Sequence, residues 1–161
     1  MGIEKGELGM TEILIMEDDP RMGDLLKDKL LQRLGERSGG IEILETESEF
    51  RLAWLNEYRE GRRQTPRVIV IDVMLPWTQA APDQPARPVD VIEGGHVRAG
   101  LRCRAEIAQI EGLKNVPLIL YSSLTADDLR KLGWEGTPGV IYVSKDDGDE
   151  IVNEVVKALA R

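Results

Sequence analysis

The sequence predicts an α/β fold in which a parallel five-stranded sheet is covered by helices on both faces. Five short β-rich runs alternate with segments of helical spacing, and three of the runs (ILIM, VIVI and LILY) are continuously apolar. Continuous apolar runs are typical of strands buried on both faces, and alternating strands and helices are typical of parallel sheets. Because strand–helix–strand crossovers are right-handed, we expect the sheet to be doubly wound in both directions from its first strand.

The expected strands span residues 13–16, 41–44, 68–71, 118–121 and 140–143. Apolar residues at helical spacing form one stripe between residues 22 and 34 and another between residues 151 and 159. Phe50, Trp54 and Tyr58 recur every four residues, which also indicates a helix.

Residues typical of helix ends flank these segments. Asp19 followed by Pro20 is typical of an N-cap with proline at the first helical position. The run from Thr125 to Asp128 resembles a capping box, with Asp in place of the usual Glu or Gln. Gly35 and Gly61 lie where the preceding helices should stop. The pattern therefore predicts where several helices begin and end.

Length and composition fit one domain with an aliphatic core. The chain has 161 residues, of which 42% are hydrophobic and 4% are aromatic. We treat residues 1–10 as a flexible lead-in and residues 11–161 as a single domain. The net charge of -8 argues against a nucleic-acid-binding surface. No apolar stretch approaches the roughly 18 residues that span a bilayer, and the single cysteine excludes an internal disulfide, so we expect a cytoplasmic protein.

One segment breaks the alternation of strands and helices. Residues 76–96 contain four of the eight prolines and show no periodic pattern, and a helix is expected to follow from near Val97. We therefore expect residues 77–96 to form a long proline-rich insertion loop. Loops of this length inside a compact domain are often functional or disordered.

Polar side chains follow four of the five expected strands. They are Glu17, Asp18 and Asp19 after the first strand, Asp72 after the third, Ser122 and Ser123 at the end of the fourth, and Lys145 after the fifth. Ligands of open parallel sheets bind at the carboxyl ends of the strands, so these groups should converge. Two carboxylates about 4 Å apart repel by roughly 4 kcal/mol at an effective dielectric of about 20, which a hard cation such as Mg²⁺ relieves. The set suits phosphoryl transfer to a carboxylate.

The runs ILIMEDDP, VIVIDVMLP, VPLILYSS and IYVSK closely resemble the receiver domains of two-component response regulators. The resemblance covers the chain from about residue 12 onward. It implies a flavodoxin-like (βα)5 fold like that of CheY, with strand order 2-1-3-4-5. It also implies a phosphoacceptor domain rather than an enzyme, with at most self-phosphorylation and slow self-dephosphorylation.

Through this resemblance, Asp72 corresponds to the phosphoacceptor. Glu17 and Asp18 correspond to the acidic pair that holds Mg²⁺ together with Asp72. Asp18 is expected to be the closer ligand and Glu17 to act through water. Met74 would offer its backbone carbonyl to the metal.

The resemblance also assigns the groups that respond to phosphorylation. Lys145 corresponds to the lysine that binds the phosphoryl group, and Ser122 corresponds to the switch hydroxyl. Tyr142, three residues before Lys145, corresponds to the aromatic switch. In the family, the hydroxyl moves inward on phosphorylation and the ring follows, which changes the surface that partners bind.

The implied partners are a sensor histidine kinase or phosphotransfer protein as phosphodonor, and an unidentified downstream protein. The sequence suggests a stand-alone domain without a nucleic-acid or membrane partner, and a homodimer is possible. The insertion loop would act as a lid that slows hydrolysis or as a docking surface.

Two other functions compete with this one. The family usually has proline where Asp146 follows Lys145, and a short glycine-containing turn in place of the long loop. These departures favour a degenerate receiver that acts as a phosphorylation-independent interaction module. A haloacid-dehalogenase-like phosphohydrolase ranks last, because it needs a second aspartate where this chain has Met74.

Several residues have simpler interpretations. Asp19 is expected to cap a helix and Ser123 to start a turn. His96 is expected to be a solvated loop histidine, and Cys103 a buried thiol. Trp77, directly after Pro76, either serves the function of the loop or anchors the loop in the core.

Overall fold

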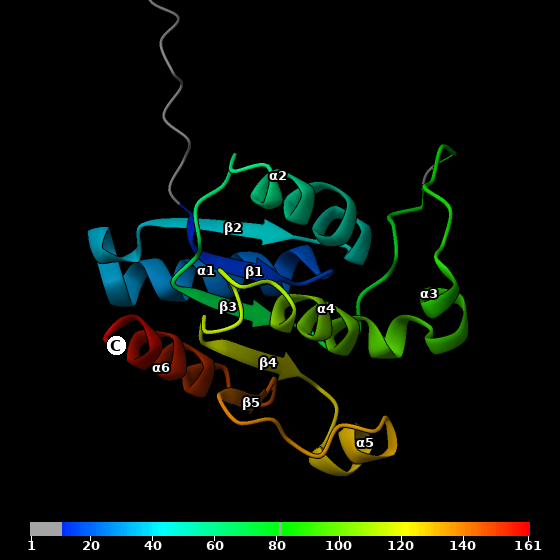
Figure 1. Cartoon of the computed structure of the whole chain (residues 1–161). Coiled ribbons are helices and arrows are strands. Elements are labelled where there is room, and N and C mark those ends of the chain that lie inside the picture. The colour runs from blue at the N-terminus through cyan, green and yellow to red at the C-terminus, as the bar shows by residue number, and fades with distance from the viewer. Residues whose placement is uncertain (1–10, 81) are drawn as a thin grey trace, which may run out of the picture.

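A parallel sheet of five strands lies between two layers of helices in the computed structural model, which describes residues 11–80 and 82–161 (Figure 1). The strand order is β2-β1-β3-β4-β5, and all four neighbouring pairs are parallel. The strands are β1 (Thr11–Met16), β2 (Gly40–Leu44), β3 (Val68–Ile71), β4 (Leu118–Ser122) and β5 (Val140–Ser144). The predicted fold class and strand order are thus confirmed. The expected lead-in, residues 1–10, lies outside the described residues.

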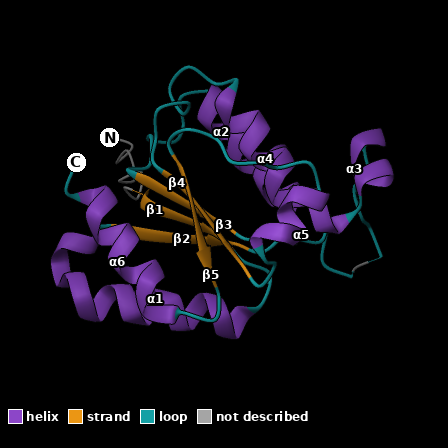
Figure 2. Ribbon diagram, turned by 90° about the horizontal axis from the view of Figure 1, so that it is seen from below, coloured by secondary structure: helices purple, strands orange, loops and turns teal. Residues whose placement is uncertain are grey.

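The helices form one layer on each face of the sheet (Figure 2). One face carries α1 (Pro20–Leu34) and α6 (Gly148–Leu159), which pack with the side chains of Ile13 and Ile15. Leu14 and Met16 belong to the core on the other face of the sheet. A second layer of helices covers that face (Figure 2). Its members are the π-helical turn η2 (Glu49–Trp54), α2 (Leu55–Arg59), α4 (Ala99–Ala108) and α5 (Ala126–Lys131). Since alternate residues of β1 enter opposite cores, both of its faces are apolar.

The predicted helix ends are found in the structure. The Asp19 carboxylate accepts a hydrogen bond from the Arg21 amide at 2.9 Å, which caps α1. Thr125 and Asp128 form the reciprocal bonds of a capping box at the start of α5. Gly35 follows α1 with a φ of 57°, a conformation that residues other than glycine rarely adopt.

The three regularly spaced aromatic residues stack on one another within the second layer. The ring centroids of Phe50 and Trp54 lie 5.7 Å apart, and those of Trp54 and Tyr58 lie 5.5 Å apart. Phe50 and Trp54 are buried, so the helical spacing of the sequence reports a core-facing stripe.

The segment expected to be an irregular insertion contains a short helix, α3 (Val89–Gly94), followed by the 3₁₀ turn η3 (His96–Arg98). The next helix, α4, begins at Ala99, two residues later than the sequence suggested. Pro88 precedes the first turn of α3, and Gly95, with a φ of 67°, ends it. A helix of six residues is too short to show a periodic pattern, which explains why the sequence did not reveal it.

The insertion is anchored to the loop after β2. Trp77 is buried, and its indole Nε1 donates to the carbonyl of Pro85 at 3.0 Å. The amides of Glu47 and Ser48 donate to the carbonyls of Pro76 and Trp77, both at 2.9 Å. Of the two interpretations of Trp77, the structure supports the anchor.

A cluster of ion pairs holds α3 against the rest of the domain. The fully buried Glu47 carboxylate accepts from Arg102 at 2.8 and 2.7 Å and from Arg51 at 3.1 Å. Arg51 also pairs with Asp90 of α3 at 3.0 Å, and its guanidinium lies 5.8 Å from the centroid of the Trp77 ring. We call Glu47, Arg51, Arg102 and Asp90 the insertion clamp. It joins the loop after β2, helix α4 and the insertion.

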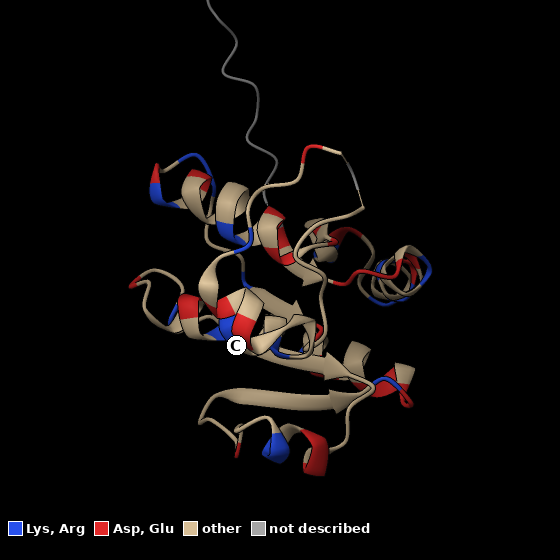
Figure 3. Cartoon of the chain, turned by 90° about the vertical axis from the view of Figure 1, so that its right-hand side faces the viewer, with Lys and Arg blue, Asp and Glu red and all other residues tan. Residues whose placement is uncertain are grey.

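Basic and acidic residues are mixed on the helices that Figure 3 shows. Within residues 11–80 and 82–161, no helix combines the length and apolar character needed to cross a membrane.

Candidate functional site

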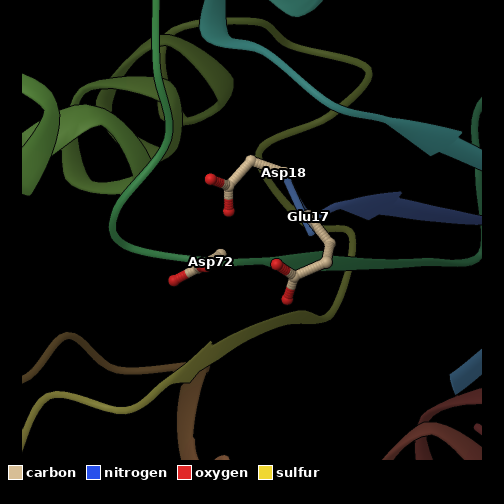
Figure 4. Close-up of side chains that lie close together, drawn as sticks. All are labelled: Glu17, Asp18 and Asp72. Atoms are coloured by element: carbon tan, nitrogen blue, oxygen red, sulfur yellow. The ribbon is translucent and has the colours of Figure 1, made fainter. Parts of the chain in front are cut away.

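Three carboxylates meet where β1 and β3 end (Figure 4). Glu17 and Asp18 follow β1, and Asp72 follows β3. Met16 pairs with Ile71 in the sheet, and the Asp72 amide donates to the Met16 carbonyl at 2.9 Å, so the residues after each strand are neighbours. One oxygen from each carboxylate lies within 4.8 Å of the others. The convergence expected from the strand order is therefore present.

Lys145, which follows β5, brings a positive charge to this cluster. Its Nζ lies 2.8 Å from Oδ2 of Asp72 and 2.5 Å from Oε2 of Glu17. Its backbone amide donates to the Ser122 carbonyl at 3.0 Å, which ties the residue to the end of β4. Glu17 and Asp72 are 2% and 4% exposed, so this ion pair is shielded from water. Lys145 thus pairs with two of the three carboxylates.

Burial controls the protonation of these groups. It raises the pKa of Asp72, against the opposing effect of Lys145, and the nearby charge of Asp18 raises this pKa further. Burial likewise raises the pKa of Glu17, although Lys145 again acts in the opposite direction. Burial would lower the pKa of Lys145, but its hydrogen bonds and charge interactions with Asp72 and Glu17 raise it overall. The two buried carboxylates are thus held where their negative charge is unfavourable.

The donor set fits a divalent cation. Carboxylate oxygens are hard ligands, and Mg²⁺ is usually bound by one or two carboxylates with water completing the shell. Glu17, Asp18 and Asp72 supply such oxygens close together, and an added cation would relieve their repulsion. Met74 lines the same hollow, and its amide donates to Oδ1 of Asp72 at 3.1 Å. That the Met74 carbonyl binds the metal stays a prediction.

The two residues expected to act as switches lie in β4 and β5, and neither is among the described residues that line the hollow of the carboxylates. Ser122 is fully buried, and its Oγ accepts a hydrogen bond from the Leu124 amide at 3.2 Å. The Tyr142 hydroxyl donates to the Leu124 carbonyl and lies 3.5 Å from the Ser122 carbonyl. Both side chains are therefore joined through the loop between β4 and α5, and their switch roles stay predictions. Ser123, which was expected only to start a turn, lines the hollow.

The carboxylates lie in an open hollow of about 430 Å³. His96 lines it together with Asp72 and Lys145. The Leu75 amide donates to the His96 carbonyl at 3.2 Å, so the two ends of the insertion meet at the site. His96 is exposed, as the sequence suggested, but it lies at the mouth of the site. No local pattern indicates this position, because it depends on how the insertion closes.

Gly100 is a second residue of the site that the sequence analysis missed. A Cβ at this position would lie 2.3 Å from the Asp72 carbonyl oxygen and 2.6 Å from Cα of Val73. The Gly100 amide donates to the Val73 carbonyl at 2.8 Å. Only glycine lets the first turn of α4 pack this closely against the backbone of Asp72. A glycine inside a helical pattern is a signal for such an approach.

Comparison with known proteins gives a clear answer for the fold. No protein-family model and no curated protein sequence matches the chain. Among solved structures, a receiver domain of a signal transduction histidine kinase from Syntrophus aciditrophicus matches with a TM-score of 0.62 and 20% identity, over 93% of this chain and 90% of that chain. The chain has the receiver fold.

Two further receiver folds match at similar levels. The phosphorylated cyanobacterial phytochrome response regulator RcpA has a TM-score of 0.58 and 19% identity, with 91% of this chain and 89% of that chain covered. The Mn²⁺-bound response regulator Rcp1 has a TM-score of 0.57 and 19% identity, with 89% of each chain covered. At such identities the likeness establishes the receiver fold, and the chemistry has to be argued from the residues of the site.

Proposed function

We propose that the chain is a response-regulator receiver domain that accepts a phosphoryl group on Asp72 in a Mg²⁺-dependent reaction. The observation that carries the proposal is the buried Asp72 carboxylate, which lies beside Glu17 and Asp18 and is held by Lys145 at 2.8 Å. The receiver fold supports it, and so do two similar structures, one of a phosphorylated protein and one of a Mn²⁺-bound protein.

In the proposed reaction, a carboxylate oxygen of Asp72 attacks the phosphorus of the phosphodonor. A new bond forms between this oxygen and phosphorus while the bond from phosphorus to the donor breaks. Mg²⁺, held by Glu17, Asp18, Asp72 and the Met74 carbonyl, would neutralise charge on the transferring group. Lys145 donates from Nζ to a phosphoryl oxygen.

Ser122 and Tyr142 would transmit the change to the surface. The Ser122 hydroxyl donates to the phosphoryl group, and in doing so gives up the bond that it accepts from the Leu124 amide. Tyr142, bonded to the Leu124 carbonyl, follows the rearranged loop. Apart from self-phosphorylation and slow loss of the phosphoryl group, we propose no enzymatic activity.

The proposal includes partners of two kinds. A sensor histidine kinase or phosphotransfer protein in the cytoplasm would supply the phosphoryl group. A downstream protein, or a second copy of this chain in a homodimer, would bind the surface changed by phosphorylation. Neither nucleic acid nor a membrane is proposed as a partner.

Intact mass after incubation with acetyl phosphate and Mg²⁺ tests the proposal. Wild type should gain one labile phosphoryl group, and Asp72→Asn should gain none. Asp146→Asn is a matched control, because Asp146 is an exposed carboxylate directly after Lys145 and outside the cluster of three. Equal labelling of wild type and Asp72→Asn would refute the assignment.

A second function is favoured by one observation. Nζ of Lys145 already bridges Glu17 and Asp72, so that the buried carboxylates have a counter-charge without metal. A degenerate receiver that serves as a phosphorylation-independent interaction module would retain such a bridge for stability. This function would be favoured if calorimetry detected no Mg²⁺ binding and if no phosphoryl adduct formed.

A further inference from the structure

The single histidine of the chain lies at the mouth of the hollow that contains Asp72. Its position is fixed from two sides. On one side, the Leu75 amide bonds to its carbonyl at 3.2 Å, three residues after Asp72. On the other side, η3 leads directly into α4, where Gly100 packs against the Asp72 and Val73 backbone.

Two other parts of the insertion, Trp77 and α3, are also held by the domain. Trp77 is buried near its start, and the insertion clamp fixes α3, which ends two residues before His96. The clamp residue Arg102 lies on α4 and bonds to the buried Glu47. His96 is therefore part of a packed framework that includes Asp72, although it belongs to an insertion.

The geometry of phosphoryl transfer determines where a hydrolytic water would enter relative to His96. Asp72 is 4% exposed and lines the hollow. The hollow is the space on its solvent side, so a phosphoryl group on Asp72 would extend toward the mouth. The nucleophile that displaces it approaches in line, on the side opposite the Asp72 oxygen. A hydrolytic water therefore enters between the phosphoryl group and the rim.

The other ionisable groups that line the hollow are engaged. Glu17, Asp18 and Asp72 form the cluster that fits a cation, and Lys145 pairs with two of them. Asp19 lies on the rim, but its Oδ1 accepts the bond that caps α1. The remaining ionisable side chain that lines the hollow, among the described residues, is the imidazole of His96, a group that often serves as a general base.

We propose that His96 is a catalytic residue for loss of the phosphoryl group from Asp72, and so limits the lifetime of the phosphorylated state. The water oxygen forms a bond to phosphorus while the bond between phosphorus and the Asp72 oxygen breaks. A proton of the water passes to an imidazole nitrogen of His96, and Asp72 leaves as a carboxylate. Inorganic phosphate is released, and His96 returns its proton to the solvent. This inference rests on the proposed function and adds the means by which the signal ends.

The decay of the adduct tests the inference. Protein is loaded with acetyl phosphate and Mg²⁺, the donor is removed by rapid desalting, and the adduct is followed by intact mass with Mg²⁺ and with EDTA. His96→Ala should slow hydrolysis by about tenfold or more, since general-base catalysis typically contributes roughly 10²- to 10⁴-fold. Arg98→Ala, an exposed change in the same turn and outside the hollow, should decay like wild type.

Free imidazole separates a chemical role from a structural one. It should restore rapid hydrolysis to His96→Ala, where it can enter the space left by the side chain, but not to His96→Phe, where a ring fills that space. Direct attack of imidazole on the phosphoryl group would act on every variant, and wild type and His96→Phe measure this background. An unchanged melting temperature of His96→Ala shows that the fold is retained.

Each failure has its own meaning. An adduct of the same lifetime in His96→Ala and wild type overturns the role of His96 and leaves the proposed function intact. If hydrolysis is also slower in Arg98→Ala, and imidazole does not restore it, the effect comes from a change in the loop. That result overturns the role of His96 as well. If wild type forms no adduct, the proposed function fails, and the role of His96 fails with it.

Discussion

Replacing Asp72 by asparagine should stabilise the metal-free protein at neutral pH by about 1 kcal/mol. The Asp72 carboxylate lies within 4.8 Å of those of Glu17 and Asp18, and at an effective dielectric of about 20 each repulsion costs about 3.5 kcal/mol. Its attraction to Lys145 at 2.8 Å contributes about 6 kcal/mol of stabilisation at the same dielectric. The two repulsions together slightly exceed the attraction, and burial of the charge adds to the penalty.

Asparagine is nearly isosteric with aspartate and can still accept the bond from the Met74 amide. Lys145 also keeps Glu17 as a partner at 2.5 Å. The free energy of unfolding is measured by urea denaturation in EDTA. Thermal unfolding should give a melting temperature about 2–4 °C higher for a domain of this size. Asp146→Asn, which removes an exposed carboxylate next to Lys145, should change stability by less than about 0.5 kcal/mol.

A loss of more than about 1 kcal/mol in Asp72→Asn would refute this reasoning. It would mean that the ion pair with Lys145 outweighs the repulsion, so that Asp72 stabilises a structural network rather than a strained binding site. The test therefore also distinguishes a site prepared for a cation from a degenerate site that has replaced the cation by lysine.

Three other predictions concern groups around the site. Burial raises the folded-state pKa of Asp72 and of Glu17, so the metal-free folded state binds more protons than the unfolded chain. The free energy of unfolding in urea should therefore fall as pH rises from about 4 through the raised pKa values. This fall should be smaller in Asp72→Asn. Gly100→Ala should lower the free energy of unfolding by about 2–3 kcal/mol and reduce labelling by acetyl phosphate, because its Cβ would lie 2.3 Å from the Asp72 carbonyl oxygen. Gly23→Ala, whose nearest contact would be 3.4 Å, should leave stability in urea nearly unchanged. Arg102→Met should cost about 3 kcal/mol in the same assay by leaving the buried Glu47 with a single arginine, and adding Glu47→Gln should recover part of that loss.

The sheet and the carboxylate cluster could be predicted because their signals are local. Runs such as VIVI report burial on both faces, and the strand order of a doubly wound sheet then brings Glu17, Asp18, Asp72 and Lys145 to one edge. The strand order itself was implied by the resemblance to receiver domains, because Glu17, Asp72 and Lys145 lie far apart in the sequence. The helix caps at Asp19 and Thr125 were equally readable, since each involves residues two or three positions apart.

The insertion clamp and the position of His96 could not be predicted in this way. Arg102 and Glu47 are 55 residues apart, and neither lies in a pattern that indicates its partner. The burial of Glu47 follows only from the joint packing of the loop after β2, helix α4 and the insertion. α3 is too short to register as a helix, so the sequence suggested an irregular loop where the structure has a fixed element.

The topology explains why an insertion at this point affects the site at its two ends. The insertion begins five residues after Asp72 and leads through η3 into α4, whose Gly100 packs against the backbone of Asp72 and Val73. Both ends must therefore meet beside Asp72, as the bond from the Leu75 amide to the His96 carbonyl illustrates, whatever the length of the chain between them. Shortening the insertion between residues 79 and 86, beyond the bonded pair, should then leave the rate of phosphoryl loss less affected than the single change His96→Ala. The reverse order would place control in the outer part of the insertion rather than at its base.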